Sequence, residues 1–146
     1  QAVIGRIQLR QLKAWSARRA KHAEAILSIC RSFDCVRVPV IPHGQEHAWY
    51  KCYLYAVPAR LKNDWSRDRI IAEVNERGVP CYQGSCSEVY RERAFDGTLL
   101  RPQEPLGVAK DLGENSLMFL VHPTLTDAEI TKTSAVLHAV LSEASA

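Results

Sequence analysis

Apolar positions recur at helical spacing from the start of the chain, and this pattern predicts a long helix over residues 2–33. The side chains expected to face inward are Ile4, Ile7, Leu12, Trp15, Ala23, Ile26, Leu27 and Cys30. The positions between them are largely basic: Arg6, Arg10, Lys13, Arg18, Arg19, Lys21 and Arg31. We interpret the basic set as a solvated helix surface, with a phosphate-binding or nucleic-acid-binding face as the alternative.

Two extended segments follow this helix. Residues 36–40 form a short apolar run interrupted by Pro39, and residues 47–57 form an aromatic-rich run that Pro58 ends. Aromatic and β-branched residues between turn residues are typical of strands. The sequence therefore predicts a strand over residues 47–57, whereas residues 36–40 are expected only to be extended.

The second half of the chain carries several local start and stop signals. Residues 63–66 supply an N-cap for a helix over 67–77, which Gly78 is expected to end. A short helix over 106–112 is expected to close at Gly113. The apolar run 116–121 predicts a strand that is buried on both faces.

A capping box opens the last predicted helix. Thr126 is followed three residues later by Glu129, and the helix is expected to continue to about Glu143. Its inward stripe would consist of Ile130, Ala135, Val136, Ala139 and Val140. The predicted fold is therefore α+β, a small sandwich of helices packed on a largely antiparallel sheet.

Composition agrees with one globular domain. The chain has 146 residues, 47% hydrophobic and 24% charged, and its net charge of +3 is too mild to indicate a nucleic-acid partner. No apolar run approaches the roughly 18 residues that a membrane span needs. Five cysteines, an odd number, favour free thiols in a reducing cytoplasm. Because Gln1 falls inside a helix without a cap residue, we expect a fragment of a longer protein.

The cysteines and histidines offer a candidate metal site. Cys30 and Cys35 are separated by four residues, as are Cys81 and Cys86, and the imidazole candidates are His43 and His47. Structural zinc sites usually use tighter Cys-x2-Cys pairs. In addition, Cys30 lies on an apolar helix stripe and Cys52 within a strand, which is typical of buried thiols. We therefore predict no metal.

Two further chemistries remain as alternatives. Cys86, flanked by serines and close to Glu88, could act as a nucleophile with a distant histidine as base, although no known local signature surrounds it. Trp49, Tyr53 and Tyr55 share one face of the predicted strand, with Tyr50 opposite. Such a face could stack RNA bases in a stand-alone binding module, but it is more often part of a core.

Several segments, in order, resemble the DegT/StrS aminotransferases. Gln1-Ala2-Val3-Ile4-Gly5-Arg6-Ile7-Gln8-Leu9, with Leu12 and Arg18-Arg19, is similar to the family's "QAAIG…QL…L…RR" helix. His47-Ala48-Trp49-Tyr50 is similar to its next strand, and Arg67-Asp68 to Gly78-Val79 to its "R…L…GI" step. Ser116-Leu117, Pro123-Thr124-Leu125-Thr126 and Glu129-Ile130 resemble its C-terminal motif. The resemblance extends from Gln1 to about Leu141.

The resemblance implies the C-terminal small domain of a type I aminotransferase fold. Residues 1–33 would be its long helix and residues 36–146 its α+β sandwich. The pyridoxal 5'-phosphate (PLP) domain with the Schiff-base lysine would be absent, so this fragment is expected to be inactive and to bind no cofactor. The parent would be a homodimer that transfers an amine from a donor, usually glutamate, to a keto-sugar nucleotide. No catalytic residue is expected among residues 1–146.

The resemblance also identifies candidate substrate contacts between Gly78 and Tyr90. This segment follows a helix and is rich in turn residues, and such loops often carry chemistry. The family commonly has a His-Tyr-Pro segment facing the substrate where this chain has Gly84, Ser85 and Cys86. This departure implies a different mode of sugar recognition. The candidate substrate-binding residues are Tyr82, Gly84, Ser85, Cys86, Ser87, Glu88 and Tyr90.

Overall fold

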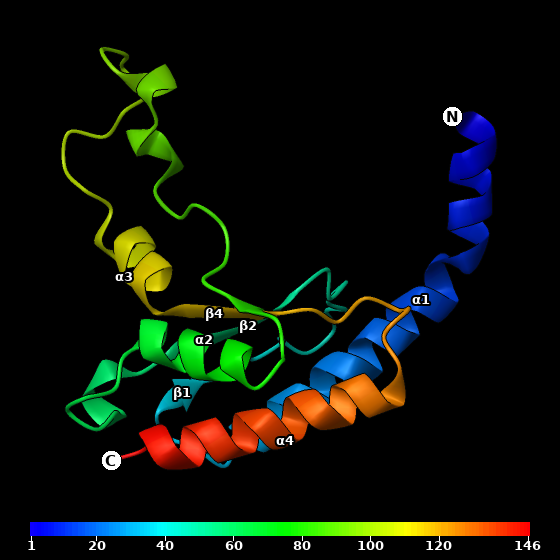
Figure 1. Cartoon of the computed structure of the whole chain (residues 1–146). Coiled ribbons are helices and arrows are strands. Elements are labelled where there is room, and N and C mark those ends of the chain that lie inside the picture. Colours follow the sequence, from blue (N-terminus) through cyan, green and yellow to red (C-terminus); the bar gives the residue numbers. More distant parts are fainter.

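The computed structural model describes residues 1–146 and contains a four-stranded antiparallel sheet in the order β1–β2–β4–β3 (Figure 1). Its strands are β1 (Val36–Arg37), β2 (Cys52–Ala56), β3 (Cys81–Tyr82) and β4 (Ser116–Phe119). The α-helices are α1 (Ala2–Cys30), α2 (Arg67–Glu76), α3 (Gly107–Asn115) and α4 (Asp127–Ala144). The predicted α+β class is confirmed.

The two faces of the sheet have different roles because side chains alternate along each strand. Leu54 on β2 pairs with Leu117 on β4, and both belong to the buried core that α1, α2 and α4 cover. Tyr53 pairs with Met118 on the opposite face. The interpretation of the aromatic face as core is confirmed only for Trp49, which packs against the core, whereas Tyr53 and Tyr55 are half-buried outside it because the core uses the alternate positions of β2.

Only the second half of α1 packs on the body of the domain. Ala23, Ile26, Leu27 and Cys30 are at most 1% exposed, as the helical periodicity predicts. Ile4, Ile7 and Leu12 were expected to face inward as well, but they are 62%, 48% and 49% exposed. The N-terminal half of the helix projects away from α4 (Figure 1). The apolar pattern thus identified the helix, although its first half stays largely exposed and borders only a hollow that Leu9 and Leu12 share with the loop over residues 41–49.

The two ends of α2 form as their residues predict. Ser66 Oγ accepts a hydrogen bond from Arg69 N–H at 3.2 Å and so caps the N-terminus. At the other end Gly78 has φ +72°, its N–H bonds Asn75 O at 2.9 Å, and Val79 N–H bonds Val74 O at 3.2 Å. This pair of bonds is a Schellman motif, for which glycine is the favoured residue.

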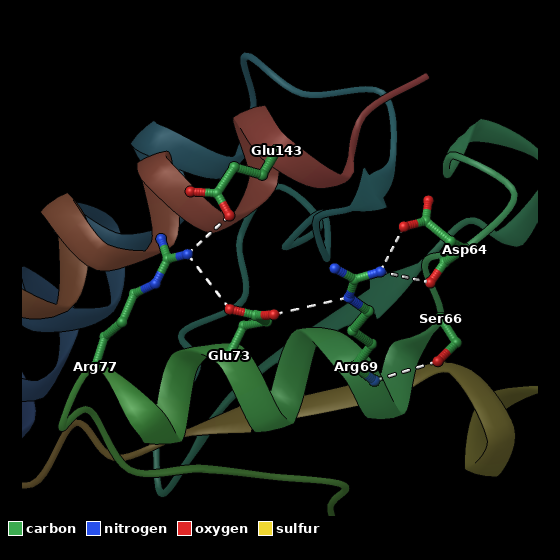
Figure 2. A network of polar contacts seen from close by, with 6 residues as sticks. All are labelled: Asp64, Ser66, Arg69, Glu73, Arg77 and Glu143. Carbon is green, nitrogen blue, oxygen red and sulfur yellow. Dashed lines mark hydrogen bonds and ion pairs between the residues drawn. The ribbon is translucent and has the colours of Figure 1, made fainter.

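A network of charged groups joins α2 to α4 (Figure 2). Arg77 lies between Glu73 on its own helix, at 3.4 Å, and Glu143 on α4, at 2.7 Å. Arg69 pairs with Asp64 at 2.6 Å and with Glu73 at 3.7 Å. The network therefore links the loop before α2, the length of α2 and the end of α4.

The capping box of α4 is confirmed, with Thr126 Oγ1 accepting from Glu129 N–H at 3.2 Å and Glu129 Oε2 accepting from Thr126 N–H at 2.7 Å. The buried stripe differs in part from the prediction. Ala135 is exposed, and the fully buried positions after Ile130 are Leu137, Val140, Leu141 and Ala144. The helix is rotated relative to the prediction so that its larger leucines fill the core.

Several predicted boundaries are wrong for identifiable reasons. The extended run expected over 36–40 joins the sheet only at Val36–Arg37, because Pro39 cannot donate to a ladder. The strand expected over 47–57 begins at Cys52, because Trp49 has φ +46° and leaves the extended conformation. Trp49 N–H instead donates to His47 Nδ1 at 3.0 Å. Gly113, expected to end a helix, lies within α3.

Candidate functional site

The segment that follows β3 lies against the second face of the sheet. Ser116 Oγ donates a hydrogen bond to Gln83 O, and the hydroxyls of Tyr53 and Ser85 are 3.3 Å apart. Gly84 has φ +96°, and a Cβ there would lie only 2.8 Å from Tyr53 Cε1. Glycine is therefore required at this position both by its conformation and by the close approach of the tyrosine ring.

An open hollow of about 370 Å³ forms between this segment and α3. Its lining residues are Gln83, Gly84, Ser85, Cys86, Ser87, Glu88, Lys110, Gly113 and Glu114. Gly113 allows α3 to lie close to Ser87, because a Cβ at position 113 would overlap Ser87 Oγ. The segment and α3 thus form a single wall.

The position of α3 is fixed by Arg67, the first residue of α2. Its Nη1 donates to Gly113 O at 3.0 Å and to Ser116 O at 3.2 Å, and the side chain is only 12% exposed. A guanidinium at this place satisfies carbonyls at the end of α3, where the helix leaves them unpaired and where the dipole favours a cation. Arg67 therefore connects the core helices to the hollow.

The charged groups of the hollow are paired within the chain. Tyr90 O–H donates to Glu88 Oε1 at 2.7 Å and Arg91 lies 3.5 Å from Oε2, and these contacts lower the pKa of Glu88 below its usual value. Lys110 and Glu114 are 3.7 Å apart, one helical turn from each other. The groups left for a ligand are mainly the hydroxyls of Ser85 and Ser87.

The candidate substrate-binding residues divide into two groups. Residues 84–88 line the hollow. Tyr82 lies on β3, 48% exposed, and Tyr90 lies behind the hollow, where its oxygen accepts a hydrogen bond from Leu106 N–H at 2.9 Å. The contact of these residues with a substrate stays a prediction. Tyr90 supports Glu88 rather than lining the hollow.

The sequence did not identify the α3 half of the hollow. Lys110, Gly113 and Glu114 lie more than 20 residues after Glu88, and only the tertiary structure brings them together. One signal was present, because a lysine and a glutamate four residues apart favour a helix that continues through both. That pairing would have extended the predicted helix beyond Gly113.

The fold does not bring together the side chains that a metal site or a catalytic cysteine would need. No group of three or more histidine, cysteine or carboxylate side chains is placed to hold a metal ion. Burial raises the pKa of Cys30, Cys52 and Cys81 to about 12. Cys86 is exposed and its thiol faces Glu92 Oε1 at 3.7 Å, not a histidine.

The aromatic side chains do not form a stacking platform. Arg37 covers the ring of Tyr55 at 4.3 Å from its centroid, and Trp49 lies outside the strand. No helix is both long enough and apolar enough to cross a membrane.

The lysines were tested as sites for an imine-forming cofactor, which requires a desolvated amine inside a cavity. Lys21 pairs with Asp127 at 3.4 Å, and Lys110 pairs with Glu114. The amines of Lys62 and Lys132 donate to backbone carbonyls at 2.7 Å and 3.0 Å. None of the six lysines is buried. No lysine of this chain therefore lies in the kind of desolvated cavity that an imine-forming amine requires.

Comparison with known proteins gives a consistent result. The model of the DegT/DnrJ/EryC1/StrS aminotransferase family matches residues 1–138. The chain is similar to an aminotransferase from Psychrobacter cryohalolentis, with 48% identity and a TM-score of 0.89 over 97% of this chain and 38% of that one. No curated protein sequence matches significantly.

Two more distant structures share the fold. The aminotransferase TlmJ from Streptoalloteichus hindustanus is 22% identical, with a TM-score of 0.80 over 95% of this chain and 35% of that one. An E. coli GDP-4-keto-6-deoxy-D-mannose-3-dehydratase, solved with bound hydrated PLP, is 19% identical, with a TM-score of 0.67 over 92% and 33%. The chain therefore spans only 33–38% of the length of these three structures.

Proposed function

Because the chain belongs to the DegT/DnrJ/EryC1/StrS aminotransferase family, we propose that it forms part of a PLP-dependent enzyme that transfers an amine from glutamate to a keto-sugar nucleotide. The match over residues 1–138 carries this proposal, and the 48% identical aminotransferase supports it. The dehydratase of the same fold carries PLP and is named for a nucleotide-linked keto-sugar. PLP, when bound, supplies the electron sink and carries the amine. The product would enter amino-sugar or polysaccharide biosynthesis in the cytoplasm.

We assign residues 1–146 to the small domain of this enzyme, with the cofactor held by a separate domain. Two observations support the assignment: the chain spans 38% of the 48% identical structure, and none of its lysines is buried. The free half of α1 exposes Val3, Ile4, Ile7, Leu9 and Leu12. Exposed apolar patches of this kind mark interaction sites. We propose that they contact the cofactor domain and the second subunit of a homodimer.

The hollow over residues 83–88 would then form one wall of the sugar pocket. Its carboxylates and its amine already have partners within the chain, so they compensate little charge on a ligand. The short side chains of Ser85 and Ser87 leave space and offer hydroxyl groups. Such a wall suits the hydroxyl and amide substituents of a sugar ring better than its phosphates.

The decisive experiment uses the protein expressed from its complete reading frame and purified with PLP. Turnover is measured as formation of 2-oxoglutarate from glutamate with a panel of nucleotide-linked keto-sugars. The proposal requires a visible cofactor band and turnover with at least one acceptor, and the absence of either would refute it. Residues 1–146 expressed alone are the control. A borohydride-fixed lysine adduct in that fragment would refute the domain assignment.

The role of the wall has its own test in the same protein. Ser87→Val should raise the KM for the keto-sugar while leaving the KM for glutamate unchanged, since it removes a hydroxyl from the hollow. Ser142→Val is the matched control, because that hydroxyl only donates to His138 O on the exposed side of α4. Equal effects of the two substitutions on both substrates would contradict a sugar-facing wall.

A further inference from the structure

A second hollow lies at the other end of β4, and the proposed function does not use it. It has a volume of about 240 Å³ and lies between the first turns of α4 and the turn that joins α2 to β3. Its floor is apolar and consists of Val79, Pro80, Phe119, Leu120 and Leu125. Its remaining lining residues are Gly78, Glu129, Lys132 and Thr133. Ser116, which borders the first hollow, and Phe119 are the two ends of β4.

The cation of this hollow is held in place by the backbone. Lys132 Nζ donates to Gly78 O at 3.0 Å. A Cβ at Gly78 would lie 2.9 Å from that nitrogen, so the glycine that ends α2 also lets the amine approach the carbonyl. Lys132 takes part in no ion pair of this chain. Its amine is therefore held in place by a hydrogen bond, while its positive charge has no acidic partner in this chain.

The anion of the hollow is fixed in a similar way. Glu129 Oε2 accepts hydrogen bonds from Thr126 N–H and Oγ1, both at 2.7 Å, and these bonds lower the pKa of Glu129. Glu129 is also absent from the ion pairs of the chain. Residues three apart on a helix lie on one face with Cβ atoms about 5–6 Å apart. The hollow is therefore lined by one cation and one anion that lie on the same face of α4 and are not paired with each other, beside an apolar floor.

We propose that this hollow binds a free α-amino acid with an apolar side chain. Its carboxylate would lie at Lys132, its ammonium at Glu129 and its side chain between Val79, Phe119 and Leu125. A zwitterion compensates both charges at once, whereas a ligand with a single charge leaves one uncompensated. A charged side chain would lose its hydration on the apolar floor without gaining a partner. The site therefore excludes glutamate and is separate from the donor site of the proposed enzyme.

Calorimetric titration of the protein, expressed from its complete reading frame, tests the proposal. L-Leucine is the probe, and it is compared with isovalerate, which lacks the ammonium, and with isoamylamine, which lacks the carboxylate. Leucine should bind at least about tenfold more tightly than each of the others, since each lost charge-assisted contact is worth roughly 1.4 kcal/mol or more. Isovalerate or isoamylamine binding as tightly as leucine would overturn the zwitterion assignment, and no binding of leucine would overturn the site.

Variants then locate the site. Lys132→Met should weaken leucine binding by about tenfold or more, and Thr133→Leu, which fills the hollow while keeping a good helix former, should abolish it. Lys62→Met is the matched control, because Lys62 Nζ likewise donates to a backbone carbonyl, that of Glu143 at the far end of α4. Equal leucine affinity in Lys132→Met and Lys62→Met would overturn the proposal. Turnover with glutamate should be the same in both variants, so failure here is distinguishable from failure of the aminotransferase proposal.

Discussion

Replacing Gly84 by alanine tests how the wall of the candidate site is held. The backbone at Gly84 has φ +96°, and forcing an L-residue into a left-handed conformation costs roughly 1–2 kcal/mol. The new Cβ would also lie 2.8 Å from Tyr53 Cε1 and 3.1 Å from Ser116 Oγ. Such overpacking typically costs about 1–3 kcal/mol. The expected loss of stability is therefore about 2–5 kcal/mol, or a fall in Tm of roughly 5–20 °C at this chain length.

Gly44 provides a matched control. It has φ +80°, but a Cβ there would meet nothing within 4 Å. Gly44→Ala should therefore show only the conformational cost of about 1–2 kcal/mol. In a Tyr53→Ala background, the cost of Gly84→Ala should fall toward the Gly44 value because the ring is gone. Urea denaturation gives the free energy of unfolding of Gly84→Ala, Gly44→Ala, Tyr53→Ala and the double variant Tyr53→Ala/Gly84→Ala. If Gly84→Ala costs no more than Gly44→Ala, close packing on Tyr53 does not hold the segment in place.

Three further predictions concern the rest of the fold. Contacts with Arg77 lower the pKa of Glu143, so its stabilising contribution is present near neutral pH and is lost as the pH falls through and below the ordinary carboxyl range. Glu143→Gln should reduce the acid dependence seen in urea denaturation from pH 7 to 3, and an unchanged dependence would contradict the network. Thr126→Ala removes the N-cap of α4 and should cost about 1 kcal/mol in the same assay, and no loss would contradict the capping role. A thiol reagent should modify one cysteine of the native fragment, Cys86, and all five only in denaturant, because the others are buried: Cys30, Cys35, Cys52 and Cys81. Rapid native labelling of a second thiol would show that the core opens.

The elements that could be predicted from sequence are those with local causes. Ser66, Gly78 and Thr126 act on neighbouring backbone groups, so the start and end of α2 and the start of α4 follow from a few adjacent residues. Strand limits depend on distant partners. β3 is only two residues long and exists because β4 lies beside it, a pairing that its own residues do not encode.

The candidate site also has one part that depends on neighbouring residues and one part that depends on distant contacts. The segment over residues 83–88 could be predicted because turn residues and polar side chains gather there in sequence. Its other half could not, because Arg67 positions α3 through carbonyls that belong to residues 113 and 116. The exposed half of α1 is a related case, since the apolar spacing of Ile4 and Ile7 indicates that a partner is needed without identifying it.

The packing of α1 on α4 has a consequence for how the protein folds during synthesis. Ser134 Oγ on α4 donates to Ala25 O on α1, and just beyond these two helices Ser145 Oγ donates to Cys35 Sγ, across 109 and 110 residues of sequence. Contacts between residues so far apart in sequence slow folding, because the entropy of closing the long loop is lost before the stabilising contacts can form. The inner face of α1 therefore stays uncovered on the nascent chain until α4 has left the ribosome. Because exposed apolar surface makes an incomplete chain prone to aggregate, translation pauses before residue 127 would lengthen the period of risk.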